Sequence, residues 1–246
     1  MDDVESLERA TLAAVPPRAQ EKIEGWLVAL DDGTVGRAHS AAPLMHDDVR
    51  VGIVPRIEAR YRAQGLQPMF RLPQLASFEL LRAVLRAEGY EMAKPTFVQT
   101  GTVEAMAAVA APDGVRLDAQ PGEGWASVFL GVGFDPLDGA SRLAILRRSR
   151  DSVFASVEVQ GRVAAVGAAC FSHGWCGVHG MRTSPALRGK GFASRILAAF
   201  AQEARRRGIG RVFLQVEQGN ATAQSVYRRA GFGTAWGYEY WAGQGG

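Results

Sequence analysis

A short stretch of the sequence combines two glycines and two cations with the start of an apolar pattern. The stretch is SPALRGKGFASRILAAF, from Ser184 to Phe200. The apolar residues that follow the turn recur at helical spacing and predict a helix beginning near Gly191; they are Ala193, Ile196, Leu197, Phe200 and Ala204. The first amides of a helix have no intrahelical acceptor and carry the positive end of the helix dipole. This turn therefore has the chemistry of an anion-binding site.

The residue types of the turn favour a phosphate as the anion. Gly189 and Gly191 lack a Cβ atom, so a phosphate could approach the backbone closely, and Arg188 and Lys190 add positive charge. The alternative is an ordinary turn between a strand and a helix, whose cations are simply solvated. The residues of the turn alone do not decide between these two interpretations.

The elements that must position this turn alternate between helices and strands. In chain order, we expect a helix over 138–151, antiparallel strands over 153–183, a buried strand over 208–220, a helix over 221–231 and an aromatic strand over 233–241. The antiparallel strands are expected to turn at Gln160-Gly161 and at His173-Gly174. The glycine turn then lies between the last of these strands and a helix.

The first half of the chain repeats part of this order. EARYRAQGLQPMFRL, which starts at Glu58, resembles EARRRGIGRVFLQV, which starts at Glu203. Further along, LRAVLRAEGYEMAKPTFV from Leu81 resembles QSVYRRAGFGTAWGYEYW from Gln224. Chance similarity among common residues is the alternative, but both matches keep the same order and nearly the same separation. The sequence therefore predicts a duplicated unit.

Length and composition fit a protein of two modest domains. The chain has 246 residues, 47% of them hydrophobic, and a polar, turn-rich stretch in the middle. We expect domains over 1–112 and 125–246 with a linker over 113–124, and sheets that pack together or join through their terminal strands. The N-terminus has no apolar signal, and the longest apolar run, from Val163, is too short to cross a bilayer. A cytoplasmic protein with no membrane partner is expected.

Charge and cysteine content add two expectations. The net charge is +3, and its densest cluster, Arg205 to Arg207, falls in the last turn of the predicted helix, where the helix dipole favours cations. No stripe of cations and aromatics accompanies it, so a nucleic-acid partner is not expected. Cys170 and Cys176 flank FSHGW and are expected to face each other across a hairpin as reduced thiols.

The second half resembles the GNAT superfamily of acyl-CoA-dependent N-acyltransferases. RGKGFA, from Arg188 to Ala193, fits that family's R/Q-x-x-G-x-G/A pyrophosphate loop, and NATAQSVYRRAGF, from Asn220 to Phe232, follows in the expected order. The well-matched region is 153–241. With a degenerate copy in front, the chain is similar to a tandem-GNAT bacterial subgroup. The resemblance implies a mixed α/β fold of two tandem GNAT-like domains, each a mostly antiparallel sheet flanked by helices.

The resemblance also implies an acetyl-CoA site. Backbone amides from 188 to 194 would hold the pyrophosphate, the strand over 181–183 would pair with the pantetheine arm, and Asn220 would contact the same arm from the facing side. The residues implied in acetyl-CoA binding are Met181, Arg182, Thr183, Arg188, Gly189, Lys190, Gly191, Phe192, Ala193, Ser194, Asn220, Ala223 and Tyr227. No metal is implied.

Proton transfer is where the chain departs from the better-known members of the superfamily. The resemblance places Tyr227 near the thioester sulfur, where its hydroxyl could protonate the departing thiolate; the alternative is a core aromatic residue. GNATs that acetylate peptide N-termini commonly have a glutamate at the position of Gln215, and an amide cannot act as a base. Glu217 or His179 could replace it, unless they are a solvated carboxylate and a satisfied strand histidine.

The first half lacks the features of a second acetyl-CoA site. The matching turn falls within 44–61, where Asp47 and Asp48 replace the cations and no G-x-G/A spacing occurs, so a pyrophosphate would be repelled. We interpret this half as structural, closing the acceptor side of the site or extending the sheet. His39 and His46 have no partners at metal-ligand spacing.

The sequence therefore predicts an N-acetyltransferase. It would move an acetyl group from acetyl-CoA to a primary amine of a small molecule or peptide, by direct attack in a ternary complex. A catalytically silent acyl-CoA-binding or regulatory protein is the alternative, supported by Gln215 and by the degenerate first half. Neither the acceptor nor the oligomeric state follows from the sequence.

Overall fold

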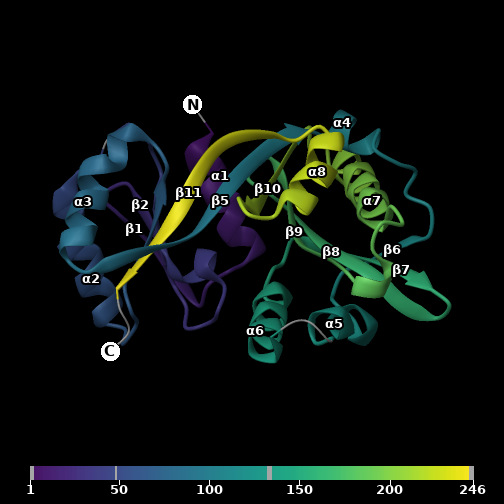
Figure 1. Cartoon of the computed structure of the whole chain (residues 1–246), viewed down its shortest axis with the longest axis horizontal. Helices are drawn as coiled ribbons and strands as arrows, with labels where there is room; N and C mark the ends of the chain where they lie inside the picture. Colours follow the sequence, from purple (N-terminus) through teal and green to yellow (C-terminus); the bar gives the residue numbers. More distant parts are fainter. Residues whose placement is uncertain (1–2, 48, 132–134, 244–246) are drawn as a thin grey trace.

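A single mixed sheet runs through the whole molecule (Figure 1). The computed structural model describes residues 3–47, 49–131 and 135–243. The sheet order is β1-β2-β3-β4-β11-β5-β10-β9-β8-β7-β6, and nearly all neighbouring strands are antiparallel. The elements of the first part are α1 (Val4–Ala14), β1 (Ala19–Ile23), β2 (Trp26–Leu30), β3 (Ala41–Pro43), α2 (Val54–Arg62), β4 (Met69–Pro73), α3 (Glu79–Ala87), β5 (Tyr90–Thr102) and α4 (Val103–Ala107).

The remaining elements form the second lobe and the strand that returns to the first. They are β6 (Val115–Asp118), α5 (Glu123–Phe129), α6 (Pro136–Arg147), β7 (Ser152–Val159), β8 (Arg162–Ser172), β9 (Trp175–Thr183), α7 (Phe192–Arg206), β10 (Arg211–Glu217), α8 (Ala221–Arg229) and β11 (Gly233–Gly243). These bounds confirm the helices and strands expected after residue 135, and the hairpin turns at 160–161 and 173–174.

The repeated sequence segments form the same succession of elements. The first copy folds as α2-β4-α3-β5 and the second as α7-β10-α8-β11. The two copies exchange their last strands, because β5 pairs with β10 of the second copy, while β11 lies between β4 and β5. Figure 1 shows β5 and β11 crossing together from one lobe to the other. The expectation that the sheets join through their terminal strands is confirmed.

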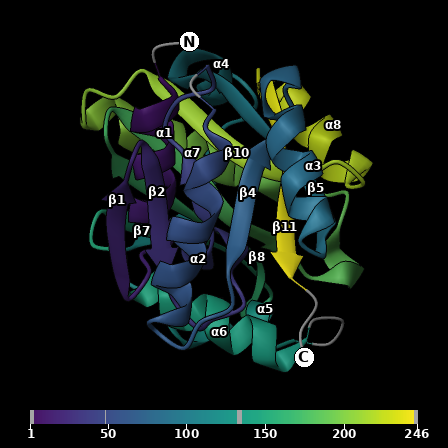
Figure 2. The same cartoon turned by 90° about the vertical axis from the view of Figure 1, so that its left-hand side faces the viewer.

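Helices cover both faces of this sheet. In Figure 2, α2 and α3 lie on the viewer's side of the first lobe's strands, where they enclose a core that includes Phe70 and Trp241. In the second lobe, α4 and α7 pack on one face and α5 on the other. Although it begins the chain, α1 packs on β8 and β9 of the second lobe. The N-terminal helix thus helps to build the second lobe.

A buried ion pair fixes α1 against the central sheet. Glu8 on α1 and Arg71 on β4 are only 3% and 2% exposed. Two guanidinium nitrogens of Arg71 donate to the two carboxylate oxygens of Glu8, one of them at 3.0 Å. The same guanidinium lies 5.0 Å from the centre of the Tyr238 ring on β11. This pair therefore joins α1, β4 and the exchanged strand.

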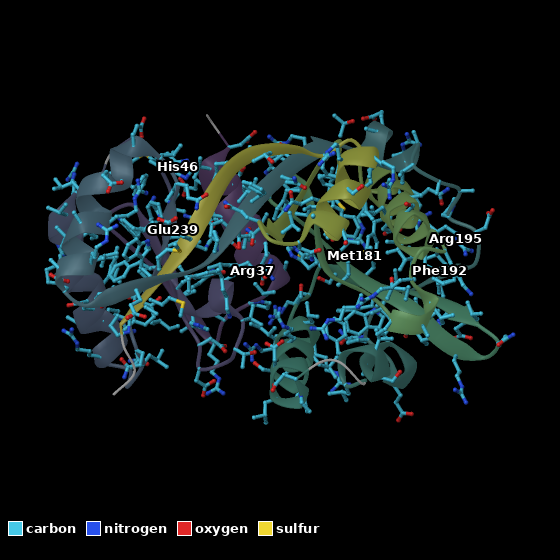
Figure 3. All side chains as sticks on the ribbon, in the orientation of Figure 1. Arg37, His46, Met181, Phe192, Arg195 and Glu239 are labelled. Atoms are coloured by element: carbon cyan, nitrogen blue, oxygen red, sulfur yellow. The ribbon has the colours of Figure 1, made fainter. Side chains whose placement is uncertain are left out.

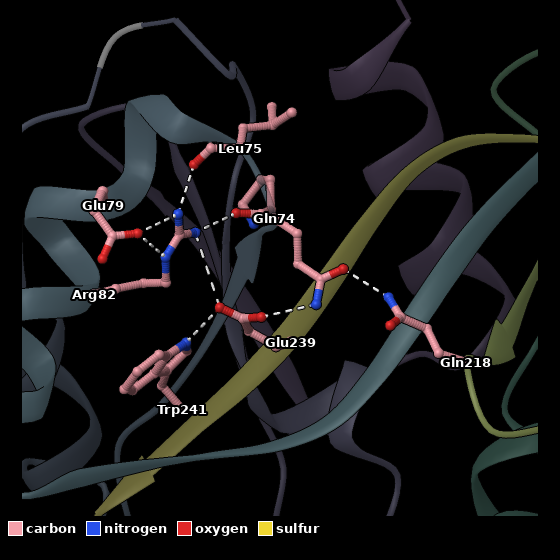
Figure 4. Close-up of polar contacts among 8 residues, drawn as sticks. Gln74, Leu75, Glu79, Arg82, Gln218, Glu239 and Trp241 are labelled. Carbon is pink, nitrogen blue, oxygen red and sulfur yellow. Dashed lines mark hydrogen bonds and ion pairs between the residues drawn. The ribbon is translucent and has the colours of Figure 1, made fainter.

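The end of β4 is tied to β11 and to the loop after β10 by side-chain contacts (Figure 4). Gln74 Nε2 donates to Glu239 Oε2 at 2.9 Å, and Gln218 Nε2 donates to Gln74 Oε1 at 2.6 Å. Arg82 donates to the carbonyl oxygen of Pro73 at 2.9 Å. Because Gln218 directly follows β10, contacts with the first copy hold the end of that strand.

The expectation that the two cysteines face each other is wrong. The hairpin register pairs Cys170 with Gly177 and Phe171 with Cys176, so the two thiols lie on opposite faces of the sheet. Both are free and buried. The error is one residue in register, which reverses the face of a strand side chain.

Other sequence expectations bear on partners and on the linker. The stretch 113–124 contains β6, which pairs with β7, so the division into domains stays a prediction. Arg206 and Arg207 are both paired with Glu203 of the same helix, which leaves them poorly suited to bind phosphates. No helix in the described part of the chain is long and apolar enough to cross a membrane. Within the same residues, no group of three or more potential ligands could hold a metal ion.

Candidate active site

The site forms where two parallel strands separate. β9 and β10 pair from Trp175 opposite Arg211 to Val178 opposite Leu214, and no further. The next residues, 179–183 of β9 and 215–217 of β10, line a cavity of about 990 Å³. A bulge helps β9 to turn away, because the pairing register with β8 shifts between Val166 and Ala168.

Two glycines make this bulge possible. Gly180 has φ +59°, in the left-handed region that glycine adopts without strain. Across from it, a Cβ on Gly167 would stand 2.4 Å from Met181 Sδ and 3.1 Å from Ile196 on α7. Side chains at these positions would therefore push β9 out of its path along the cavity.

The cavity brings together every residue predicted for the site. The lining includes residues 179–183 and 187–194, together with 215–217, Asn220, Ala223 and Tyr227. Figure 3 shows Met181 lying between Phe192, at the start of α7, and Arg37, which comes from the first half. The roles of these residues remain predictions, but their proximity does not depend on the choice of role.

The glycine turn has the geometry of an anion site. Gly189 and Gly191 have φ +78° and +77°, and Gly191 is the N-cap of α7, with no side chain capping the first amides. A Cβ at either glycine would meet no atom within 4 Å, so the space in front of the turn is open. Arg188 and Lys190 are exposed beside it. The backbone amides are thus free to bind an anion with help from two cations.

The corresponding turn of the first half has a different geometry. β3 lies parallel to β4 as β9 does to β10, so residues 44–53 correspond to the glycine turn. Gly52 is not in the left-handed region, and Pro55 in the first turn of α2 has no amide hydrogen. Of the two aspartates expected to repel phosphate, Asp48 lies outside the described residues.

The edge of β9 that faces the cavity offers free backbone groups. Ser184 N donates to Ala164 O on β8, which fixes the edge to which this residue points. Because backbone groups alternate along a strand, those of Thr183 and Met181 point toward the opposite edge, where β10 has moved away. On the facing side, Asn220 Oδ1 caps α8 by accepting from Ala223 N at 3.1 Å, so a ligand contact would use its amide nitrogen.

Tyr227 is one of the residues that line the cavity. Its ring packs against Phe232, with 6.0 Å between ring centres, and against the core beneath α7. Burial raises the pKa of Tyr227 to about 12. The hydroxyl therefore keeps its proton at neutral pH and can act as a donor.

His179 lies in an environment that argues against a role as base. The side chain is 5% exposed, and its Nδ1 lies 3.4 Å from Arg37 Nη1. Burial, and then the positive charge of Arg37, lower the pKa of His179 well below its usual value. A neutral imidazole of such low basicity takes up a proton poorly. Glu217, exposed at the end of β10, is the remaining predicted base.

Sequence analysis missed two of the residues that surround Gln215, Arg37 and Thr11. Arg37 Nη1 and the Tyr238 hydroxyl each donate to Gln215 Oε1 at 3.1 Å, while Gln215 Nε2 donates to Thr11 Oγ1 at 3.2 Å. Arg37 and Thr11 come from the first half, from stretches with no recognisable motif. The first half therefore forms part of the cavity wall.

Solved structures share this fold over nearly the whole chain. A GCN5-related N-acetyltransferase from Kribbella flavida has a TM-score of 0.72 at 18% identity, covering 100% of this chain and 97% of that one. A tandem GNAT protein from the clavulanic acid biosynthesis pathway has a TM-score of 0.61 at 15% identity, covering 98% and 94%. The mixed fold and the GNAT resemblance are confirmed, and the chain is an acetyltransferase of the GNAT superfamily.

The sequence comparisons narrow this class. The profile of the family described as "Probable histone acetyltransferase Rv0428c C-terminal" matches residues 2–241, and the chain belongs to that family. The chain is also 25% identical to the "Uncharacterized N-acetyltransferase YobR" of Bacillus subtilis over 240 residues, which cover 94% of this chain and 95% of that protein. Both matches extend across the two halves.

Proposed function

We propose that the protein transfers an acetyl group from acetyl-CoA to a primary amine by direct attack in a ternary complex. The observation that carries this proposal is one continuous cavity, which extends from the uncapped start of α7 into the gap between β9 and β10. Its far end is closed by Arg37 and Val35 of the first half. The acetyl donor and the amine acceptor could thus meet end to end in this cavity.

Acetyl-CoA fits the groups that line this cavity. Its pyrophosphate would accept from the amides at the start of α7, and its pantetheine amides would pair with the open edge of β9. The thioester would then lie at the separation of the strands, close to Tyr227. Bound there, acetyl-CoA supplies the activated acyl group, and the protein supplies position and protons.

The chemistry requires two proton transfers. The amine nitrogen attacks the thioester carbon, and backbone donors at the separated strands would stabilise the developing oxyanion. When the C–S bond breaks, the Tyr227 hydroxyl would protonate the thiolate and later recover its proton from solvent. The proton lost by the amine would pass to Glu217, directly or through water.

Thiol release in the presence of an amine tests this function. The panel would include amino acids, polyamines, aminoglycosides, and peptides with a free N-terminus or an internal lysine. Peptides with an internal lysine are included because the family is described as a probable histone acetyltransferase. Amine-dependent thiol release together with an acetylated product would support the proposal. Binding of acetyl-CoA without transfer to any amine would support the silent, acyl-CoA-binding alternative.

Replacing Gly191 by Val should weaken acetyl-CoA binding about tenfold or more. Valine is strained at φ +77°, and its side chain would enter the open space that a pyrophosphate needs. Gly208→Val is the matched control, because Gly208 follows the other end of α7 with φ +69° and equally open space. Calorimetry should find one site per chain. Two sites, or unchanged affinity in a folded Gly191→Val protein, would contradict this prediction.

Replacing Glu217 by Gln should lower kcat/KM for the amine by about 10-fold to 10²-fold near neutral pH. The loss should shrink above the pKa of the amine, because a neutral amine needs no base before attack. Glu158→Gln, which changes an exposed carboxylate near the end of β7, is the control for the loss of one surface carboxylate. A pH-rate profile of Glu217→Gln parallel to that of the wild type would remove Glu217 from the mechanism.

A further inference from the structure

The acceptor end of the cavity is positively charged. Among the described residues that line the cavity, the cationic side chains are Arg37, Arg142, Arg182, Arg188, Lys190 and Arg229, and the only carboxylate is Glu217. Arg188 and Lys190 belong to the glycine turn, where the donor phosphates would bind. Of the four arginines that remain, Arg229 ends α8. The other three lie near the place where an amine must enter, although most amines are themselves cations at neutral pH.

Two of these arginines share a counterion. Arg142 Nε donates to Asp138 Oδ2 at 2.6 Å, and Arg182 Nη2 lies 3.9 Å from the same oxygen. The Arg182 guanidinium also stacks over the Phe129 ring, 4.3 Å from its centre. The protein itself thus offsets much of their charge.

Arg37 lacks such compensation. Its contacts are to neutral groups, Gln215 Oε1 at 3.1 Å and His179 Nδ1 at 3.4 Å, and no carboxylate within the described chain forms an ion pair with it. Burial lowers the pKa of Arg37, and the nearby tyrosines offset part of this shift. A desolvated cation without an anion is costly, so a native protein retains one where a ligand supplies the missing charge.

The guanidinium is held in place but not saturated. Both of its contacts use Nη1, so the other N–H groups of the planar fork remain available. The turn that carries Arg37 is fixed by the exchanged strand, because Gly36 packs so tightly on the Tyr240 ring that a Cβ would stand 2.9 Å from it. Held in place, half-buried and lining the cavity, Arg37 is built to bind a planar anion.

We propose that the acceptor amine carries an anionic group, such as a carboxylate or phosphate, that pairs with Arg37 in the cavity. This inference rests on the proposed function and names the class of acceptor. Amino acids and other amines with a carboxylate fit best, since the guanidinium fork matches that group. Polyamines, aminoglycosides and basic peptides would bring further positive charge to an end of the cavity that is already cationic.

Gln215 is the second element of this selectivity. A glutamate at this position would lie within ion-pair distance of Arg37 and neutralise it internally. The neutral amide instead orients the guanidinium, through the same hydrogen bond, and leaves its charge for the substrate. Glutamine at position 215 cannot act as a base, but it leaves the charge of Arg37 available to bind an anion.

Matched acceptors test the inference. Each amino acid would be compared with its carboxamide and its aminophosphonate analogue, at fixed acetyl-CoA. In the wild type, kcat/KM should be at least about tenfold higher for an anionic acceptor than for the carboxamide. The favoured anion identifies the group as carboxylate or phosphate. Calorimetric binding of the same compounds to the enzyme saturated with CoA should show the same order without turnover.

Variants assign the preference to Arg37. Arg37→Met and Gln215→Glu should each bring the ratio of kcat/KM for the acid to kcat/KM for the carboxamide close to one, the first by removing the cation and the second by neutralising it. The KM for acetyl-CoA should change little in either variant. Arg37→Lys should retain part of the preference. Equal use of acid and amide by the wild type, an equal loss for both in Arg37→Met, or strongest activity on basic peptides would overturn the inference. Failure to acetylate any amine would instead refute the proposed function.

Discussion

Replacing Glu8 by Ala is expected to lower the free energy of unfolding by about 3–5 kcal/mol. The substitution leaves the Arg71 guanidinium 2% exposed and without its anion. Burying an uncompensated charge costs much more than the net stability that an ion pair contributes. Urea unfolding followed by circular dichroism would measure the change.

The same helix provides a control for this prediction. Glu5 pairs with Arg9 at the surface, where both side chains are partly exposed to solvent, so Glu5→Ala should cost no more than about 1 kcal/mol. The double variant Glu8→Met/Arg71→Met removes both charges and should recover most of the stability lost in Glu8→Ala. Similar losses for Glu5→Ala and Glu8→Ala would mean that the buried charge is not the cause.

The Glu8 variant also bears on function through α1. This helix carries Thr11, which accepts from Gln215 Nε2, and it ends next to Val15 in the cavity wall. If α1 loosens, the acceptor end of the cavity should be disturbed before the glycine turn at the start of α7. A rise in the KM for the amine, with the KM for acetyl-CoA little changed, is the expected kinetic result.

The elements of the second half were predictable because their signals are local. Apolar spacing marks α7, alternation marks β10, and Gly189 and Gly191 mark the turn between them, since each rests on backbone preferences within a few residues. The repeat likewise predicted that the sheets could join. It did not say which strands would exchange, because β5 and β11 carry similar patterns and pairing is decided by distant packing.

The acceptor end could not be predicted for the same reason. Arg37 and Gln215 are 178 residues apart, and the polar stretch around Arg37 resembles any surface loop. Only the exchange of strands brings the turn with Arg37 against β11 and β10. The cysteine error has a similar origin, since the face of Cys176 depends on a register that the hairpin sequence leaves open by one residue.

Replacing Tyr227 by Phe is expected to lower kcat by about 10²-fold. The proposed acid acts only when the C–S bond breaks, so the KM for acetyl-CoA should barely change. Phenylalanine keeps the ring and its contact with Phe232, so the core beneath α8 should stay packed. The pKa of about 12 keeps the wild-type hydroxyl protonated over the working pH range, so this residue should cause no loss of rate on the alkaline side of the pH profile within that range.

Controls for Tyr227→Phe must separate chemistry from packing. Tyr90→Phe also removes a hydroxyl, one that donates to Glu58 Oε1 at 2.6 Å in the other lobe, and it should leave kcat unchanged. Thiolates are fair leaving groups, and a more acidic thiol needs less help from a proton donor. The kcat for slow or weakly activated thioesters should therefore depend on Tyr227 more than the kcat for acetyl-CoA analogues with more acidic thiols. If Tyr227→Phe lowers kcat by the same factor for every analogue, the loss would come from a misplaced acetyl donor and not from the missing proton. Wild-type kcat in the variant, once chemistry is shown to limit turnover, would exclude Tyr227 as the acid.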